Sequence, residues 1–156
     1  MNGNEWTGYH NSRDRNYRSP FGAVPAGRRV RLCLGVLSPD APEEVVLRLW
    51  SDHKGEEKIP MALTDRKGKD GARVYAAEIV PEFPQVLWYY FIIRYRGTLG
   101  YYSRSDDRYG GTGCLDSRPL HSYQITVYRP DFHVPKWYRE GVAYQIFPDR
   151  FRKGGN

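Results

Sequence analysis

Apolar and polar residues alternate with a period of two along much of the chain, which is the spacing of a strand that buries one face. The clearest example begins at Val30, where apolar side chains recur at every second position up to Val36 and are separated by residues such as Arg31 and Gly35. The predicted strands cover residues 30–36, 45–50, 58–63, 73–80, 86–96, 98–103 and 122–128. About seven short strands, with turn residues between them and no convincing helical spacing, predict an all-β chain folded as an antiparallel, immunoglobulin-like β-sandwich.

The most apolar run covers residues 86–96 and is bulky at both odd and even positions. Such a run is typical of a central strand that is covered on both faces, at least in part. One face is predicted to carry Tyr89, Phe91, Ile93 and Tyr95, of which Tyr89 and Phe91 are assigned to the core. The opposite face is predicted to carry Trp88, Tyr90, Ile92 and Arg94.

Composition divides the chain into four parts. Residues 1–28 are polar and are interrupted by proline and glycine, so an irregular lead-in is expected. The β-sandwich domain is predicted over residues 29–128, followed by a proline-containing linker over residues 129–141. A new apolar run opens residues 142–156, and we assign it to a different structural unit because the sandwich is already complete.

The charge of the chain gives no clear partner. There are 24 Lys and Arg against 18 Asp and Glu, a formal net charge of +6. The basic residues are scattered and no nucleic-acid-binding motif is present, which argues against a nucleic-acid partner. No apolar run is long enough for a membrane span and no secretory signal pattern opens the sequence, so a cytoplasmic location without a membrane partner is expected.

Potential metal and phosphate motifs are weak. Cys33 and Cys114 lie far apart, and the four histidines have no metal-ligand spacing, so two ordinary thiols and surface histidines are predicted. The glycines in "RSDDRYGGTGCLDSRPLHS" are not followed by the helix and the Lys-Ser/Thr pair of a phosphate-binding loop. This stretch is expected to form a long, flexible loop.

The stretch "WYREGVAYQIFPDRF" near the end of the sequence resembles the first strand of the (β/α)8 barrel in the alpha-amylase family of glycoside hydrolases. Upstream, "YRSPFGAVPAG", "LWYYFII" and "SYQITVYRPDFHVPKW" are similar to the N-terminal β-sandwich modules of the neopullulanase and amylopullulanase type. The resemblance implies an accessory, carbohydrate-binding-like domain at residues 29–128. It also implies that residues 142–156 are the truncated start of a catalytic barrel that the domain contacts in cis.

Catalytic residues are not predicted in this chain. Retaining hydrolysis of a glucosidic bond needs two carboxyl groups held close together, and past Gly141 the sequence offers only Asp149. Asp149 and its neighbour Arg150 are interpreted as a structural ion pair at a strand end. No cofactor is predicted for the chain itself. The resemblance implies calcium only in a full-length parent, and Asn156 is the one candidate ligand here.

Five aromatic residues are the candidates for carbohydrate binding: Trp50, Trp88, Tyr90, Tyr101 and Tyr102. Each lies on or beside a predicted strand, and pyranose rings present apolar faces that stack on exposed aromatic rings. Aromatic residues in strands also commonly pack in the core or at a domain interface, so each of the five has that alternative interpretation.

Three classes of function remain open at this stage. The chain is an accessory domain that contacts starch, pullulan or maltooligosaccharides, or it is the same domain acting only as a scaffold or homodimer surface. The third class is an unrelated basic binding protein, such as a nucleic-acid-binding domain. The resemblance favours the first two, and the sequence does not choose between them because it does not reveal which aromatics are exposed.

Overall fold

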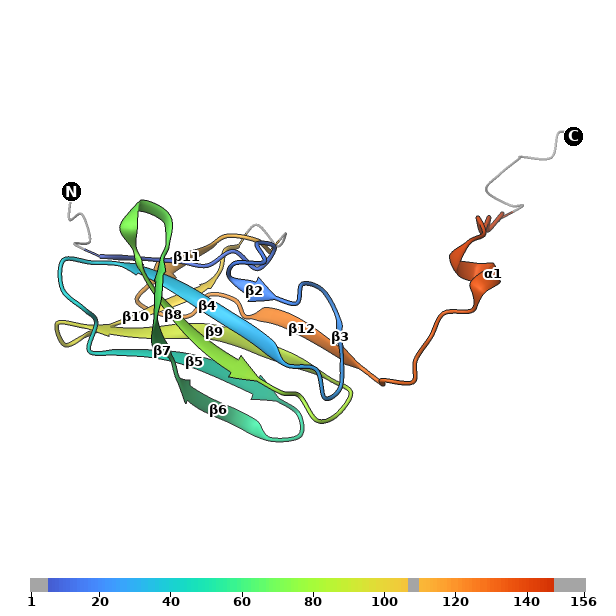
Figure 1. The fold of residues 1–156 in the computed structure, drawn as a ribbon, viewed down its shortest axis with the longest axis horizontal. Helices are drawn as coiled ribbons and strands as arrows, with labels where there is room; N and C mark the ends of the chain where they lie inside the picture. The colour runs from blue at the N-terminus through green and yellow to red at the C-terminus, as the bar shows by residue number, and fades with distance from the viewer. Residues whose placement is uncertain (1–5, 107–109, 148–156) are drawn as a thin grey trace, which may run out of the picture.

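The computed structural model describes residues 6–106 and 110–147, and it shows two β-sheets packed face to face with an extended C-terminal segment (Figure 1). The five-stranded sheet contains β1, β2, β4, β7 and β8, and the seven-stranded sheet contains β3, β5, β6, β9, β10, β11 and β12. The strand bounds are β1 Thr7–Tyr9, β2 Arg18–Ser19, β3 Val24–Pro25, β4 Val30–Leu37, β5 Glu44–Ser51, β6 Gly55–Pro60, β7 Ala62–Lys67, β8 Arg73–Ile79, β9 Gln85–Tyr95, β10 Thr98–Arg104, β11 Gly113–Asp116 and β12 Tyr123–Tyr128. The prediction of an all-β sandwich is confirmed.

Strand β9 organises the larger sheet. Antiparallel β5 pairs with it, while β12 pairs with its first half and β10 with its second half. Its inward side chains Tyr89, Phe91 and Ile93 are fully buried, and its alternate residues face away from the core. The predicted alternation of this central strand is therefore confirmed. All pairings in the two sheets are antiparallel except that of β12 with β3, which is parallel.

The apolar faces of both sheets form one core. Alternate residues of β4 from Val30 to Val36 are fully buried and contribute to the same cluster as Leu47 of β5 and Ile125 of β12. The sequence periodicity thus identified the buried face of each of these strands correctly. Cys33 lies on the other face of β4 and is also buried, because Tyr17 and Val74 cover it.

The prediction of an irregular lead-in over residues 1–28 is wrong for residues 6–28, the part that the structure describes. This segment supplies β1 and β2 to one sheet and β3 to the other, and its His10 is completely buried. The histidine was expected at the surface. Short strands of two or three residues leave no periodicity in the sequence, which is why this part of the sandwich was missed.

Two further strand predictions need correction. The single strand expected over residues 58–63 is divided at Met61 into β6 and β7, which belong to different sheets. Met61 is buried in the core, so the chain crosses between the layers at this point. The long loop expected after residue 103 contains β11, which pairs with β10 as an edge strand. A strand of four residues that begins with a glycine has too weak a pattern to be recognised.

The segment after β12 leaves the sandwich (Figure 1). Within the predicted linker, Lys136–Arg139 form the single helical turn α1, and a short 3-10 turn, η1, covers Lys69–Gly71. Residues 142–147 form no strand and expose large apolar side chains, and the rest of the predicted barrel start lies outside the described residues. Among the helices of the described residues, none has the length and apolar character needed to cross a membrane.

His10 connects the two sheets through its imidazole ring. Nδ1 lies 2.8 Å from the carbonyl oxygen of Cys33 in β4, and Nε2 lies 3.1 Å from the hydroxyl of Tyr89 in β9. Because a carbonyl only accepts, Nδ1 carries the proton and the Tyr89 hydroxyl donates to Nε2. Burial lowers the pKa of His10 from its ordinary value of 6.5 to about 3, and the positive charge of Arg18 acts in the same direction. The ring is therefore neutral at physiological pH.

The first prediction concerns pH. The unfolded chain binds a proton at His10 below about pH 6.5, whereas the folded chain does so only near pH 3, so stability is lost as the pH falls through this window. Between pH 7 and pH 5 this histidine should reduce the free energy of unfolding by about 2 kcal/mol. Urea denaturation at the two pH values measures the loss.

The variants His10→Gln and His53→Gln make the comparison specific, since His53 is exposed on the β5–β6 turn. The difference in stability between pH 7 and pH 5 should shrink in His10→Gln and persist in His53→Gln. An unchanged pH dependence in His10→Gln would contradict the assignment of the neutral buried ring.

Candidate carbohydrate-contact face

The outward side of the seven-stranded sheet carries a row of aromatic residues. Trp50 of β5 is the cross-strand partner of Trp88 of β9, and Gln124 of β12 is the partner of Trp88 on its other side. One step along the sheet, Arg48 is opposite Tyr90, and Tyr101 of β10 is opposite Ile92 in the next row. These residues alternate with core residues on their strands, so strand pleating places them on one surface.

Trp88 is the most accessible ring of this surface. Its exposed fraction is 36%, whereas Trp50, Tyr90 and Tyr101 are half-buried. Directly opposed residues in an antiparallel pair hold their side chains close together, so the two indoles form neighbouring apolar surfaces. Four of the five aromatic residues predicted from sequence are thus brought together on one sheet face.

Arg48 fixes the middle of the row. Its guanidinium carbon lies 5.1 Å from the centre of the Tyr90 ring, and Nη2 lies 3.3 Å from Oε2 of Glu56 on β6. The Tyr90 and Tyr101 rings meet edge to face with centres 6.2 Å apart. Burial raises the pKa of Tyr90, although the Arg48 charge opposes the shift, so the phenol stays neutral and can donate a hydrogen bond at physiological pH.

A polar depression adjoins Trp88. Its lining includes Gln124, Ser122 and Arg104, whose Nε lies 3.4 Å from the carbonyl oxygen of Ser122. Arg18 also contributes, with Nη1 donating to the carbonyl oxygen of Gln124 at 3.0 Å. An aromatic face bordered by guanidinium and amide groups provides both stacking and hydrogen bonding. Sequence reasoning missed Arg104 and Gln124, since nothing in their local pattern shows that they flank Trp88.

Tyr102 does not belong to this face, and its assignment as a stacking residue is corrected. The side chain is 1% exposed and lies in the core. Its hydroxyl donates to the carbonyl oxygen of His10 at 3.0 Å and accepts from the backbone N–H of Gly113 at 2.9 Å. Consecutive residues of a strand point to opposite sides, so Tyr101 and Tyr102 are unable to share one surface.

Metal-binding groups are absent from the part of the chain that the structure describes. No group of three or more His, Cys, Asp or Glu side chains there is arranged to hold a metal ion. The candidate calcium ligand Asn156 lies outside the described residues, so calcium binding in a parent protein stays a prediction. Cys33 is buried in β4, and Cys114 is half-buried in β11.

The structure is similar to part of a cyclomaltodextrinase, with a TM-score of 0.54 and 17% identity, over 91% of this chain and 23% of that protein. No protein-family model matches the chain.

Sequence comparison gives more specific relatives. The chain is 32% identical to the amylopullulanase of Thermoanaerobacterium thermosulfurigenes over 146 residues, which is 93% of the chain and 8% of the relative. It is 31% identical to the amylopullulanases of Thermoanaerobacterium saccharolyticum and Thermoanaerobacter thermohydrosulfuricus, covering 93% of the chain and 11% and 10% of those proteins. The resemblance to the β-sandwich module of an alpha-amylase-family glycoside hydrolase is confirmed, and the chain spans about a tenth of the relatives' length.

The second prediction separates the neighbouring tyrosines. Tyr102→Phe removes a hydroxyl that satisfies two buried backbone groups, so it should lower the free energy of unfolding by about 1–3 kcal/mol. Tyr101→Phe is the matched control and should change stability by less than about 0.5 kcal/mol. Chemical denaturation of both variants measures the difference, and equal effects would contradict the placement of Tyr102 in the core.

Proposed function

We propose that this chain is an accessory domain of an α-glucan hydrolase and that the outward face of its seven-stranded sheet contacts the glucan. The single observation that carries this proposal is the aromatic row on that face, with Trp88 exposed beside Trp50, Tyr90 and Tyr101. The similarity to amylopullulanases supports the class of enzyme. If a catalytic barrel follows in the same polypeptide, such a contact would hold the glucan near its active site.

The surface suits a chain of neutral sugars. Pyranose C–H faces pack against the indoles of Trp50 and Trp88, and the hydroxyls exchange hydrogen bonds with Gln124 and Arg104 beside them. Arg48 and Glu56 offer a donor and an acceptor next to Tyr90. Binding a polymer here would raise its local concentration at a tethered active site without any chemistry in this domain.

The third prediction tests sugar binding. Maltoheptaose should bind with a dissociation constant in the high micromolar to millimolar range, on the order of 10⁻⁴ to 10⁻³ M, since each stacked ring contributes on the order of 1 kcal/mol. Trp88→Ala should weaken binding by roughly tenfold. Titration calorimetry and the indole N–H signals of the tryptophans measure both quantities.

Leu63→Ala is the control because Leu63 is also a large exposed apolar residue, at 58%, but lies on β7 of the opposite sheet. This variant should bind maltoheptaose like the unaltered chain. If saturating shifts are absent at millimolar sugar, the proposed contact is wrong and the scaffold function takes its place.

The scaffold function has its own supporting observation. The C-terminal segment exposes a series of large apolar side chains, including Trp137 at 76%, Val142 at 79% and Tyr144 at 86%. Such a segment gains stability by packing against another surface, which would be a following domain or a second copy of the chain.

The fourth prediction concerns this segment. If it mediates self-association, sedimentation velocity should show a concentration-dependent dimer for the full chain and a monomer after removal of residues 141–156. Monomers in both cases would count against the homodimer alternative and leave packing against a barrel in cis. The shortened chain should keep its unfolding free energy within about 1 kcal/mol, because the described part of the removed segment, residues 141–147, is exposed.

A further inference from the structure

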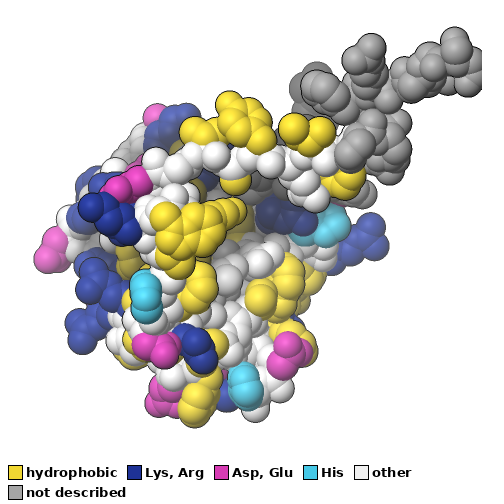
Figure 2. Space-filling model, turned by 90° about the vertical axis from the view of Figure 1, so that its right-hand side faces the viewer, with side chains coloured by type: hydrophobic (Ala, Val, Ile, Leu, Met, Phe, Trp, Pro, Cys, Tyr) yellow, Lys and Arg dark blue, Asp and Glu magenta, His cyan; other side chains and the backbone are white. Residues whose placement is uncertain are grey.

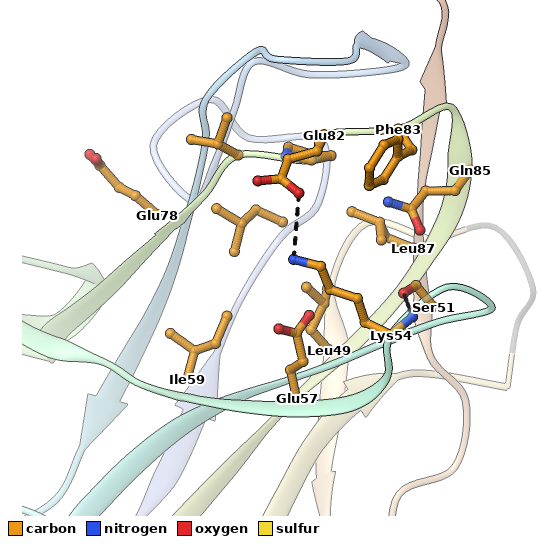
Figure 3. A pocket seen from close by; sticks show the side chains of 13 residues that line it. Leu49, Ser51, Lys54, Glu57, Ile59, Glu78, Glu82, Phe83, Gln85 and Leu87 are labelled. Atoms are coloured by element: carbon orange, nitrogen blue, oxygen red, sulfur yellow. Dashed lines mark hydrogen bonds and ion pairs between the residues drawn. The ribbon is translucent and has the colours of Figure 1, made fainter.

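A second concave site lies between the two sheets at the end where the C-terminal segment leaves the sandwich. The cavity has a volume of 160 Å³ and is bordered by the β5–β6 turn and the β8–β9 loop (Figure 3). Figure 2 views the molecule from this end and shows hydrophobic side chains exposed among acidic and basic ones. A cavity of about 150 Å³ accommodates one six-membered ring such as benzene.

The floor of this cavity is a continuation of the apolar core. Leu49, Leu87 and Ile59 face inward from three adjacent strands, and Ile79 faces them from β8 of the other sheet. Phe83 of the β8–β9 loop stands beside them with half of its surface exposed, and its ring centre is 5.7 Å from that of His53. These side chains offer aliphatic and aromatic contact to one ring.

The inward pattern changes from apolar to polar at the rim. On β9, Leu87 is followed on the same face by Gln85, and on β5, Leu49 is followed by Ser51. On β6, Glu57 is the cross-strand partner of Leu49 and therefore also faces inward. Gln85 Oε1 is buried and has no hydrogen-bond partner in the described structure. Buried polar atoms normally have partners, so this oxygen marks an incomplete set of interactions.

The charges at the rim are largely neutralised already. Lys54 Nζ lies 3.9 Å from a carboxylate oxygen of Glu82, and the Lys54 side chain extends toward Glu82 in Figure 3. Glu78 pairs with Arg29 at 3.3 Å. Glu57 has no ion-pair partner among the described residues. This balance favours a neutral ligand that donates hydrogen bonds over a multiply charged cation.

From these features we infer that the cavity binds one pyranose ring. The C–H face of the ring packs on Phe83 and the aliphatic floor, and its hydroxyls donate to Glu57 and Gln85 Oε1. The Lys54 ammonium donates to a ring hydroxyl oxygen. A purely apolar ring would leave the acceptors of Glu57 and Gln85 unpaired, and a polyhydroxylated ring satisfies them.

This site is separate from the aromatic row of the outward sheet face. Trp50 and Ser51 are consecutive residues of β5 whose side chains lie on opposite sides of the sheet, and only Ser51 lines the cavity. An inward-facing glutamate on an edge strand also has another recognised role, which is to prevent pairing with the edge of a second molecule. A test must therefore distinguish ligand binding from this protective function.

The experiment uses the intact chain and methyl α-glucopyranoside as the probe, followed by backbone amide and methyl chemical shifts. We expect saturating shifts of Ile59, Leu87 and Gln85 with a dissociation constant on the order of 10⁻³ M. Phe83→Ala should weaken this binding about fivefold to tenfold, and Glu57→Gln should weaken it severalfold while preserving side-chain size. Leu63→Ala, which alters an exposed apolar side chain on β7 that does not line the cavity, should leave it unchanged.

Measurements on two variants distinguish binding in the cavity from binding on the aromatic row. In Trp88→Ala the cavity shifts should persist, and in Phe83→Ala the tryptophan indole shifts with maltoheptaose should persist. Indole shifts without any cavity shift would overturn the cavity site alone. Cavity shifts with benzyl alcohol but none with the glucoside would also overturn it, since the cavity would then accept only an apolar ring. A rise in dimer content in Glu57→Gln without any effect on glucoside binding would assign the glutamate to edge protection.

Discussion

The packing of the two sheets depends on one buried imidazole. His10 donates to Cys33 of one sheet and accepts from Tyr89 of the other, while its own carbonyl accepts from Tyr102. These bonds satisfy polar groups that would otherwise be unpaired in the core, and they also hold the N-terminal segment between the layers. Tyr89 lies near the centre of β9, the longest strand, so this contact fixes the position of β9 relative to the opposite sheet.

The position of β9 in turn determines the outward surface. A shift of its register by one residue would move Tyr89 outward and Trp88 into the core, because side chains alternate with a period of two. The His10 contact and the tight inward packing of Phe91 exclude that shift. Trp88 and Tyr90 therefore lie on the outward face because the alternate residues Tyr89 and Phe91 are held in the core. Arg18 strengthens the same arrangement, since its guanidinium joins the N-terminal segment to β12 beside Trp88.

Sequence patterns predicted the long strands well and the small ones poorly. The alternation from Val30 to Val36 and from Tyr89 to Tyr95 identified their buried faces, because burial of one face repeats often enough in these runs to leave a signal. The roles of His10 and Tyr102 were not predictable in this way. Each depends on a partner far away in the sequence, and a single buried polar residue leaves no periodic trace. The same limit explains why the polar groups beside Trp88 were missed.

The cavity between the sheets has a related physical origin. A sandwich must end where its strands turn, and at that end the inward positions are no longer shielded by a full complement of neighbours. Here the chain places Ser51, Glu57 and Gln85 at those positions instead of closing the core with further apolar residues. The result is an apolar floor with a polar rim, separated from the outward aromatic row only by the thickness of β5. Trp50 and Ser51 are consecutive residues of β5, so one strand end supplies a side chain to each of the two surfaces.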